Sequence, residues 1–287
     1  MQLVLNNAKR KVIELDGDIP KFGLLTDPIE GVVEQILRFK KLGFDFTEIG
    51  IEEPKATPQA LMSQKNLIIN SLRETEMFAI GHTAYWVQFG SSHLKARRGW
   101  VEEGKDMVKV ASELRIQYLN FHFYGRLGRV GATREFALGF VENFTNSITE
   151  LTEFAAEKKV ELMLENVPSQ DGGVADFRNF SAVMEKVPKL MFHFDIAHAY
   201  IENRMAGIRS YLDAFSDRLV HIHIHDNHGE EDEHLPLGWG KIDFRKVVRW
   251  LKELNYDKTI TFEVFTSNQD AVRSREYFRK LWNKTKV

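Results

Sequence analysis

The chain has 287 residues, of which 43% are hydrophobic, 28% charged and 11% aromatic. This composition is typical of a globular protein with a large core, and it excludes a mainly disordered chain. The formal net charge of −2 shows no overall basic excess of the kind that nucleic-acid binders often carry, although a local basic patch is compatible with it. The sequence contains no cysteine, which excludes disulfides, thiolate nucleophiles and sulfur-ligated zinc. Any metal must therefore bind nitrogen and oxygen.

The N-terminal stretch MQLVLNNAKRKVIELDGD has no apolar run of the signal-peptide type, and no run of eighteen uncharged apolar residues occurs in the sequence. We therefore expect a cytoplasmic protein that does not act in a membrane. We expect residues 1–20 to form an N-terminal extension, as a short hairpin or a lid across the bottom of the fold, and residues 21–287 to form one domain.

Eight short β-type runs alternate with longer amphipathic stretches along the chain. Helical stretches such as IEGVVEQILRFKKLG and ALGFVENFTNSITELTEFAAEKK repeat apolar residues at spacings of three and four. Because no linker or shift in composition interrupts the alternation, the sequence predicts an α/β protein with a single (β/α)8 TIM barrel. The expected strands are FGLLTD (22–27), FDFTEIG (44–50), MFAIGH (77–82), QYLNFH (117–122), VELMLEN (160–166), LMFHFD (190–195), LVHIHIHD (219–226) and TITFEVF (259–265).

Acidic and imidazole side chains occupy the expected strand ends. In a TIM barrel the chemistry gathers at the C-terminal ends of the strands, where the following loops form the open face. The last inward position of each strand from the second to the eighth carries a carboxylate or an imidazole. These positions are Glu48, His82, His122, Glu165, Asp195, His223 and Glu263, and His198, Asp232 and His234 lie just beyond strand ends.

Several of the histidines have a simpler interpretation. A single inward histidine in a barrel is more often a hydrogen-bonded core residue than a ligand, and we interpret His193 and His221 in this way, one layer deeper than the strand ends. His93 and His228 are expected to be ordinary loop residues. The run GEEDEH (229–234), taken alone, is equally consistent with a solvated acidic loop.

The complete set at the strand ends is harder to explain as core packing. Glu165, Asp195 and Glu263 would bring like charges together in a partly desolvated mouth, which is costly unless cations or protons neutralise them. A metal centre resolves this conflict. Imidazole and carboxylate ligands without thiolate suit zinc, manganese, iron or cobalt.

The sequence resembles the xylose-isomerase-like TIM-barrel superfamily. The motifs GHTAYW, LNFHFYG, LENVPS, FDIAHAY and HIHDNHGEEDEHLPLGWGKIDF carry the resemblance, each at the end of an expected strand and in the expected order. This superfamily contains sugar and sugar-phosphate isomerases and epimerases, and also the endonuclease IV family of DNA-repair enzymes. The resemblance spans nearly the whole barrel.

Similarity to the isomerase and epimerase branch implies one divalent metal held by Glu165, Asp195, His223 and Glu263. In that chemistry the metal polarises a carbonyl and its neighbouring hydroxyl, while carboxylates move a proton on and off the adjacent carbon. Glu165 and Glu263 would be the catalytic carboxylates. We expect Glu48 and His225 to lie beside the substrate or behind the metal ligands, where Glu48 could orient His82 or bind a hydroxyl.

Similarity to endonuclease IV implies three metal ions instead. His82, His122 and a bridging Glu165 would hold the first, Glu165, Asp195, His223 and Glu263 the second, and His198, Asp232 and His234 the third. Such a cluster suits phosphodiester hydrolysis. We expect two or three ions with zinc as the preferred metal, and manganese or cobalt as alternatives.

Departures from both branches leave the substrate open. The chain has His228 where endonuclease IV carries a lysine, and Gly229 where some ketose epimerases carry an arginine. We favour a metal-dependent isomerase or epimerase that binds a small sugar or sugar phosphate. The alternatives are a zinc phosphodiesterase of the abasic-site endonuclease type, which would bind nucleic acid, and a catalytically silent barrel that binds carbohydrate or metal.

Overall fold

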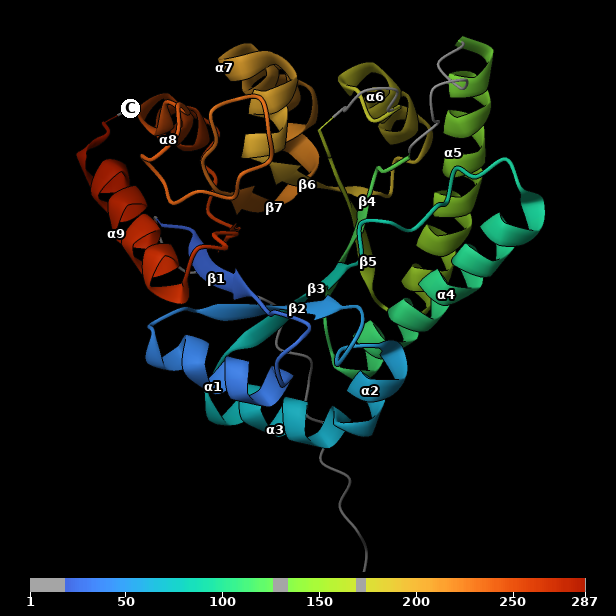
Figure 1. Ribbon diagram of the computed structural model, residues 1–287, viewed down its shortest axis with the longest axis horizontal. Coiled ribbons are helices and arrows are strands. Elements are labelled where there is room, and N and C mark those ends of the chain that lie inside the picture. Colours follow the sequence, from blue (N-terminus) through green and yellow to red (C-terminus); the bar gives the residue numbers. More distant parts are fainter. Residues whose placement is uncertain (1–18, 126–133, 169–173, 287) are drawn as a thin grey trace, which may run out of the picture.

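The computed structural model describes residues 19–125, 134–168 and 174–286. Eight parallel strands close into a barrel in chain order (Figure 1), which confirms the predicted (β/α)8 TIM barrel. The strands are β1 (Lys21–Leu25), β2 (Phe46–Ile51), β3 (Phe78–Thr83), β4 (Tyr118–His122), β5 (Glu161–Glu165), β6 (Met191–Asp195), β7 (Leu219–Ile224) and β8 (Thr259–Phe262).

Helices surround the barrel, and the connection from β2 to β3 contains two of them. The helices are α1 (Val32–Lys41), α2 (Pro58–Ser63), α3 (Lys65–Glu74), α4 (Leu94–Glu113), α5 (Arg134–Glu157), α6 (Phe177–Lys186), α7 (Ile196–Phe215), α8 (Phe244–Glu253) and α9 (Asn268–Lys284), with a short 3-10 turn at Ser216–Arg218. The predicted hairpin or lid falls almost entirely on residues 1–18, outside the described part of the chain. No described helix is long and apolar enough to cross a membrane.

Short polar side chains fix where several helices begin. Asp176 accepts the backbone N–H of Asn179 at 2.8 Å at the start of α6. Ser267 accepts the N–H of Asp270 at the start of α9. Each bond satisfies a backbone donor that has no partner within the helix.

The apolar core lies mainly between the strands and the surrounding helices. Phe180 of α6 is fully buried there and makes ring contacts with Phe192, Tyr211 and Phe215. A smaller apolar cluster includes Phe46, which is stacked on Phe78 with ring centroids 5.1 Å apart. The barrel is therefore a packed core and not an open channel.

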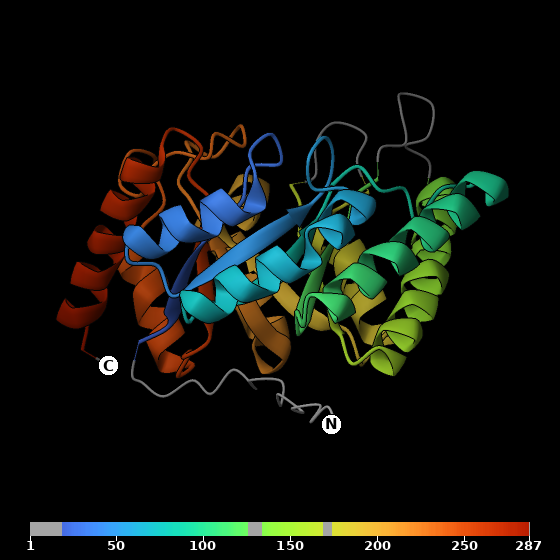
Figure 2. The same ribbon diagram turned by 90° about the horizontal axis from the view of Figure 1, so that it is seen from below.

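The inward face of the barrel changes from apolar to polar along the strands. Ile80 and Met163 are fully buried, and each lies two residues before an ionisable residue, His82 and Glu165, on the same strand. Successive inward residues are two apart, so the ionisable layer lies nearer the C-terminal strand ends. Figure 2 shows the loops after β1, β2 and β7 along one edge of the molecule, which is the edge that these strand ends face.

Candidate metal centre

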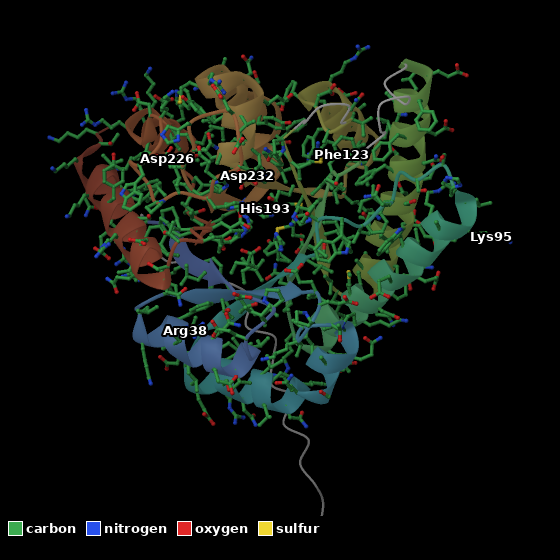
Figure 3. All side chains as sticks on the ribbon, viewed as in Figure 1. Arg38, Lys95, Phe123, His193, Asp226 and Asp232 are labelled. Carbon is green, nitrogen blue, oxygen red and sulfur yellow. The ribbon has the colours of Figure 1, made fainter. Side chains whose placement is uncertain are left out.

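Eight of the ten histidines gather at the polar end of the barrel. His193 is labelled near the middle of the ring of strands in Figure 3. His93 and His228 are exposed and lie apart from this group. The eight histidines of the group make imidazole–carboxylate contacts of 4.0 Å or less with five acidic residues. The histidines are His82, His122, His193, His198, His221, His223, His225 and His234, and the acids are Glu48, Glu165, Asp195, Asp232 and Glu263.

The ligands expected for a first ion lie together on β3, β4 and β5. Oε2 of Glu165 is 3.5 Å from Nε2 of His82 and 3.1 Å from Nε2 of His122. The side chain of Asn120 donates a hydrogen bond of 2.6 Å to the same oxygen. Burial raises the pKa of Glu165, but the imidazoles of His193, His122 and nearby residues lower it more, so it lies well below its usual value. Glu165 is therefore an ionised, buried carboxylate.

The ligands expected for a third ion surround one carboxylate oxygen. Oδ2 of Asp232 lies 3.1 Å from Nε2 of His198 and 3.0 Å from Nε2 of His234. The other nitrogen of His198 lies 2.8 Å from the carbonyl oxygen of Asn166. His234 has a backbone φ of 48°, in the left-handed region that costs energy for a residue with a side chain. Such strain is typical of functional positions.

The ligands expected for a second ion are only partly brought together. Nδ1 of His223 lies 3.1 Å from Oε2 of Glu263 and 3.8 Å from Oε1 of Glu165. Asp195 instead faces His225, with Oδ2 of Asp195 3.3 Å from Nε2 of His225. The four side chains thus line one space, with Asp195 on the side toward His225.

His225 is more central than the sequence indicated. Its Nε2 also lies 3.5 Å from Oδ1 of Asp232 and 4.0 Å from Oε2 of Glu263. Its ring is stacked on that of His234, with centroids 4.1 Å apart. His225 therefore joins the second and third groups and has the position of an additional ligand.

Glu48 makes its shortest contacts with the histidines of β7, and one of its carboxylate oxygens lies within 4.8 Å of a ring nitrogen of His82. Oε2 of Glu48 lies 2.8 Å from Nε2 of His223 and 3.2 Å from Nε2 of His221, and its side chain is fully buried. Burial raises the pKa of Glu48, but these two imidazoles lower it more, to well below its usual value. Glu48 thus lies behind His223, away from solvent.

His193 and His221 occupy the deeper layer. Both are fully buried, with ring centroids 4.6 Å apart. His221 bonds to Thr259 at 2.8 Å as well as to Glu48. Nδ1 of His193 lies 3.3 Å from Oε2 of Glu165. His221 is thus the hydrogen-bonded core residue that the sequence predicted. The same prediction is wrong for His193, because both of its ring nitrogens are buried and make no hydrogen bond among the described residues.

The residues present suit metal ions. Oδ2 of Asp195, Oδ1 of Asp232 and Nε2 of His225 are all buried and make no hydrogen bond within the described part of the chain. Buried polar atoms are normally satisfied, and here three of them converge within ion-pair distance. A cation at this position would satisfy all three. The nitrogen and oxygen donors suit zinc, manganese, iron or cobalt.

Asp226 organises the loop that carries Asp232 and His234, and the sequence did not reveal this role. One of its oxygens accepts the backbone N–H groups of Gly238 and Gly240, each at 2.9 Å, and the backbones of Asp226 and Leu235 pair as an antiparallel bridge. A side chain at Gly240 would lie 2.3 Å from the carbonyl oxygen of Asn227. The segment from Asp226 to Gly240 therefore stabilises the shape of this loop. The glycines of the GWG run (238–240) were its only signal in the sequence.

Comparison with known families places this geometry in context. The model of the family described as "Xylose isomerase-like TIM barrel" matches residues 36–281. The chain belongs to this family. Its members among curated proteins include relatives with a named activity and relatives without one.

Two curated proteins and one solved structure illustrate what this chain is similar to. An uncharacterized protein of Methanocaldococcus jannaschii is 33% identical over 49% of this chain, which spans about half (48%) of that relative. Fructoselysine 3-epimerase of Escherichia coli O157:H7 is 26% identical over 84% of this chain and 90% of its own length. The crystal structure of a D-tagatose 3-epimerase-like protein superposes with a TM-score of 0.79, at 24% identity over 92% of this chain and 97% of its own. Sugar epimerases are thus homologues of this protein.

Proposed function

We propose that this protein is a divalent-metal-dependent isomerase or epimerase that acts on a sugar or sugar phosphate. The observation that carries the proposal is that carboxylate oxygens of Glu165 and Glu263 converge on one atom, Nδ1 of His223, at 3.8 and 3.1 Å. Glu165 ends β5 and Glu263 directly follows β8, and these two strands are not neighbours in the barrel. The similarity to fructoselysine 3-epimerase over most of both chains supports the same class of activity.

The two carboxylates are suited to moving a proton. Burial raises the pKa of Glu263, but His223 and His234 lower it further, to about 2. The pKa of Glu165 also lies well below its usual value, so both groups are ionised at neutral pH. One, as the base, would take the proton from the carbon beside the substrate carbonyl. The other would first take up a proton from solvent and then give it to the same carbon from the opposite face.

The surrounding residues hold these bases in place and keep water away. The side chains of His82, His122 and Asn120 surround Glu165, which is 1% exposed. When bound, a divalent metal would polarise the carbonyl and the adjacent hydroxyl of the substrate. Glu165, Asp195, His223 and Glu263 would hold it, with His225 next to Asp195.

A second candidate function is supported by the group around Asp232. A one-metal isomerase has no evident need for His198, Asp232 and His234 as a further ligand set, yet both imidazoles lie within 3.1 Å of one Asp232 oxygen. Several cations at one site suit the hydrolysis of phosphodiesters. This alternative is a zinc hydrolase of the endonuclease IV type.

Solvent deuterium exchange tests the proposed function. The metal-loaded protein is incubated in deuterium oxide with a panel of ketoses, aldoses and their phosphates, and the label at the carbon beside the carbonyl is measured by NMR. We expect incorporation with at least one sugar, and loss of incorporation in Glu263→Gln. The exposed His228→Asn variant is the matched control. Cleavage of abasic-site DNA or small phosphodiesters, without exchange on any sugar, would establish the alternative.

A further inference from the structure

A cavity of about 570 Å³ lies beside the metal centre and has no role in the proposed chemistry. It is lined by residues that follow β2 and β3 and by one face of α4, including Glu52, Glu53, Trp86, Trp100 and Glu103. Its volume is in the range of cavities that bind small organic molecules. The cavity is therefore large enough for a substantial part of a ligand.

The cavity and the metal centre share the open end of the barrel. Glu52 follows Ile51, the last residue of β2, and Ile51 itself lines the cavity. The charges of His82 and Glu263 act on the carboxyl group of Glu52, and both residues belong to the metal centre. A sugar held at the centre would have this cavity next to it, so a substituent on the sugar can extend into it.

The charge of the cavity is negative and unbalanced. Glu52, Glu53 and Glu103 line it, whereas no lysine, arginine or histidine does. In the described ranges none of these three carboxylates forms an ion pair. Burial raises the pKa of Glu52, and nearby Asp27 and Glu263 raise it further although His82 lowers it. A positively charged ligand would relieve this repulsion.

The basic side chains of α4 do not line the cavity. Lys105 contacts Glu102 and Glu150, each at 2.8 Å, and Arg98 contacts Glu150 at the same distance. Figure 3 shows Lys95 extending outward at the far end of this helix. The face that lines the cavity instead presents Ala96, Gly99, Trp100, Glu103 and Met107.

Two indole rings complete a surface that favours cations. Trp86, 42% exposed, and Trp100 both line the cavity. A cation over the face of an indole is attracted by the quadrupole of the ring. Carboxylates and indoles in one cavity are a combination that recognises ammonium groups better than neutral hydroxyls.

We propose that this cavity binds the ammonium group of a cationic substituent on the sugar substrate, so that the substrates of this protein are sugars that carry an amine. This inference rests on the proposed function, because only an enzyme that acts on sugars has a sugar substrate. The binding of an amine in the cavity can nevertheless be measured without turnover. Recognition combines Glu52, Glu103 and the two indoles.

The binding test compares two sugars that differ in one group. A ketose carrying a 5-aminopentyl chain and the same ketose with a 5-hydroxypentyl chain are titrated into the metal-loaded protein by calorimetry. We expect the amine to bind at least about tenfold more tightly at low salt, with the difference shrinking as salt screens the carboxylates. Glu103→Gln and Glu52→Gln should each remove most of this preference. Glu102→Gln, on the same helix but paired with Lys105, is the matched control and should retain it.

Turnover separates this inference from the proposed function. For an active enzyme we expect a lower KM for the amine at an unchanged kcat, and Glu103→Gln should raise KM for the amine alone. Equal affinity for both compounds, or an unchanged preference in both glutamine variants, would overturn the inference even if both sugars are epimerised. A preference for the amine without exchange on these two sugars or on any sugar of the panel would leave the cavity assignment intact and refute the proposed function. Melting temperatures of the variants confirm that each one folds.

Discussion

Oε2 of Glu48 on β2 lies 2.8 Å from Nε2 of His223 on β7, on strands that are not neighbours in the barrel. The other nitrogen of His223 faces Glu263 at 3.1 Å. An imidazole that donates one N–H to a buried carboxylate has its remaining nitrogen fixed in direction and made more basic, which is how metal-binding histidines are usually supported. We therefore expect Glu48 to orient His223 for a metal ion.

Glu48→Gln should weaken metal binding by about 10- to 100-fold, because the amide cannot replace the negative charge behind His223. Competition with a fluorescent chelator measures the affinity. Glu202→Gln is the control, since Glu202 is a partly buried carboxylate on α7 that bonds to Phe177 and Tyr211 away from the metal centre. Equal affinity in the wild type and Glu48→Gln, with an unchanged circular dichroism spectrum, would show that Glu48 does not support the ligand.

Glu165→Ala and Asp195→Ala should each release metal and remove activity. Each change deletes a carboxylate from a cluster of imidazoles, and in the expected ligand sets both residues hold the second ion. Elemental analysis of protein purified without chelator gives the metal content, and the exchange assay gives the activity. If both variants retain the metal content of the wild type, the ligand assignment is wrong.

We expect two or three ions per chain in the wild type, with zinc preferred, and the loss of one of them in Asp232→Ala. The reason is that a single Asp232 oxygen lies within 3.1 Å of both His198 and His234, so its removal takes away the group that joins them. Mass spectrometry under native conditions counts the ions. A single manganese or cobalt ion that Asp232→Ala leaves in place would refute the multi-ion centre.

Metal binding should release protons at neutral pH. Burial lowers the pKa of His234, but Glu263 and Asp232 raise it to about 9, and Asp195 and Asp232 likewise raise that of His198 well above its usual value. Without metal both rings are protonated at pH 7, whereas a ligand must be neutral. Affinity should therefore rise with pH up to about 9. Calorimetry in buffers of different ionisation enthalpy counts the protons, and a buffer-independent enthalpy would contradict this prediction.

The fold and the membership of the polar cluster could be predicted because both follow from local rules. Inward residues alternate along a strand, and strand ends meet at one face of a barrel. These two rules placed His82, Glu165 and Glu263 at the same mouth, and the structure brings all three into contact with other members of the cluster.

The pairings inside the cluster could not be predicted. Glu48 and His223 are 175 residues apart in the chain, and their contact depends on the barrel interior and on side-chain rotamers. The same is true of His225, which was expected beside the substrate or behind the metal ligands but which contacts Asp195 and Asp232. The cavity between α4 and the ends of β2 and β3 depends on how the helices pack, which no local sequence pattern indicates.

The two carboxylate oxygens of Asp195 make different contacts. Oδ1 accepts the backbone N–H of His198 at 2.7 Å and so caps the start of α7, while Oδ2 faces His225. Helical geometry breaks at Asn203 and Arg204, so the first turns of α7 form a short segment of their own. An ion bound to Oδ2 would therefore be held by the same carboxylate that caps the N-terminal end of that segment. The amide hydrogens of this segment should therefore exchange more slowly when the centre is loaded, which makes the helix start a reporter of occupancy even for metals, such as zinc, that have no colour or unpaired electron.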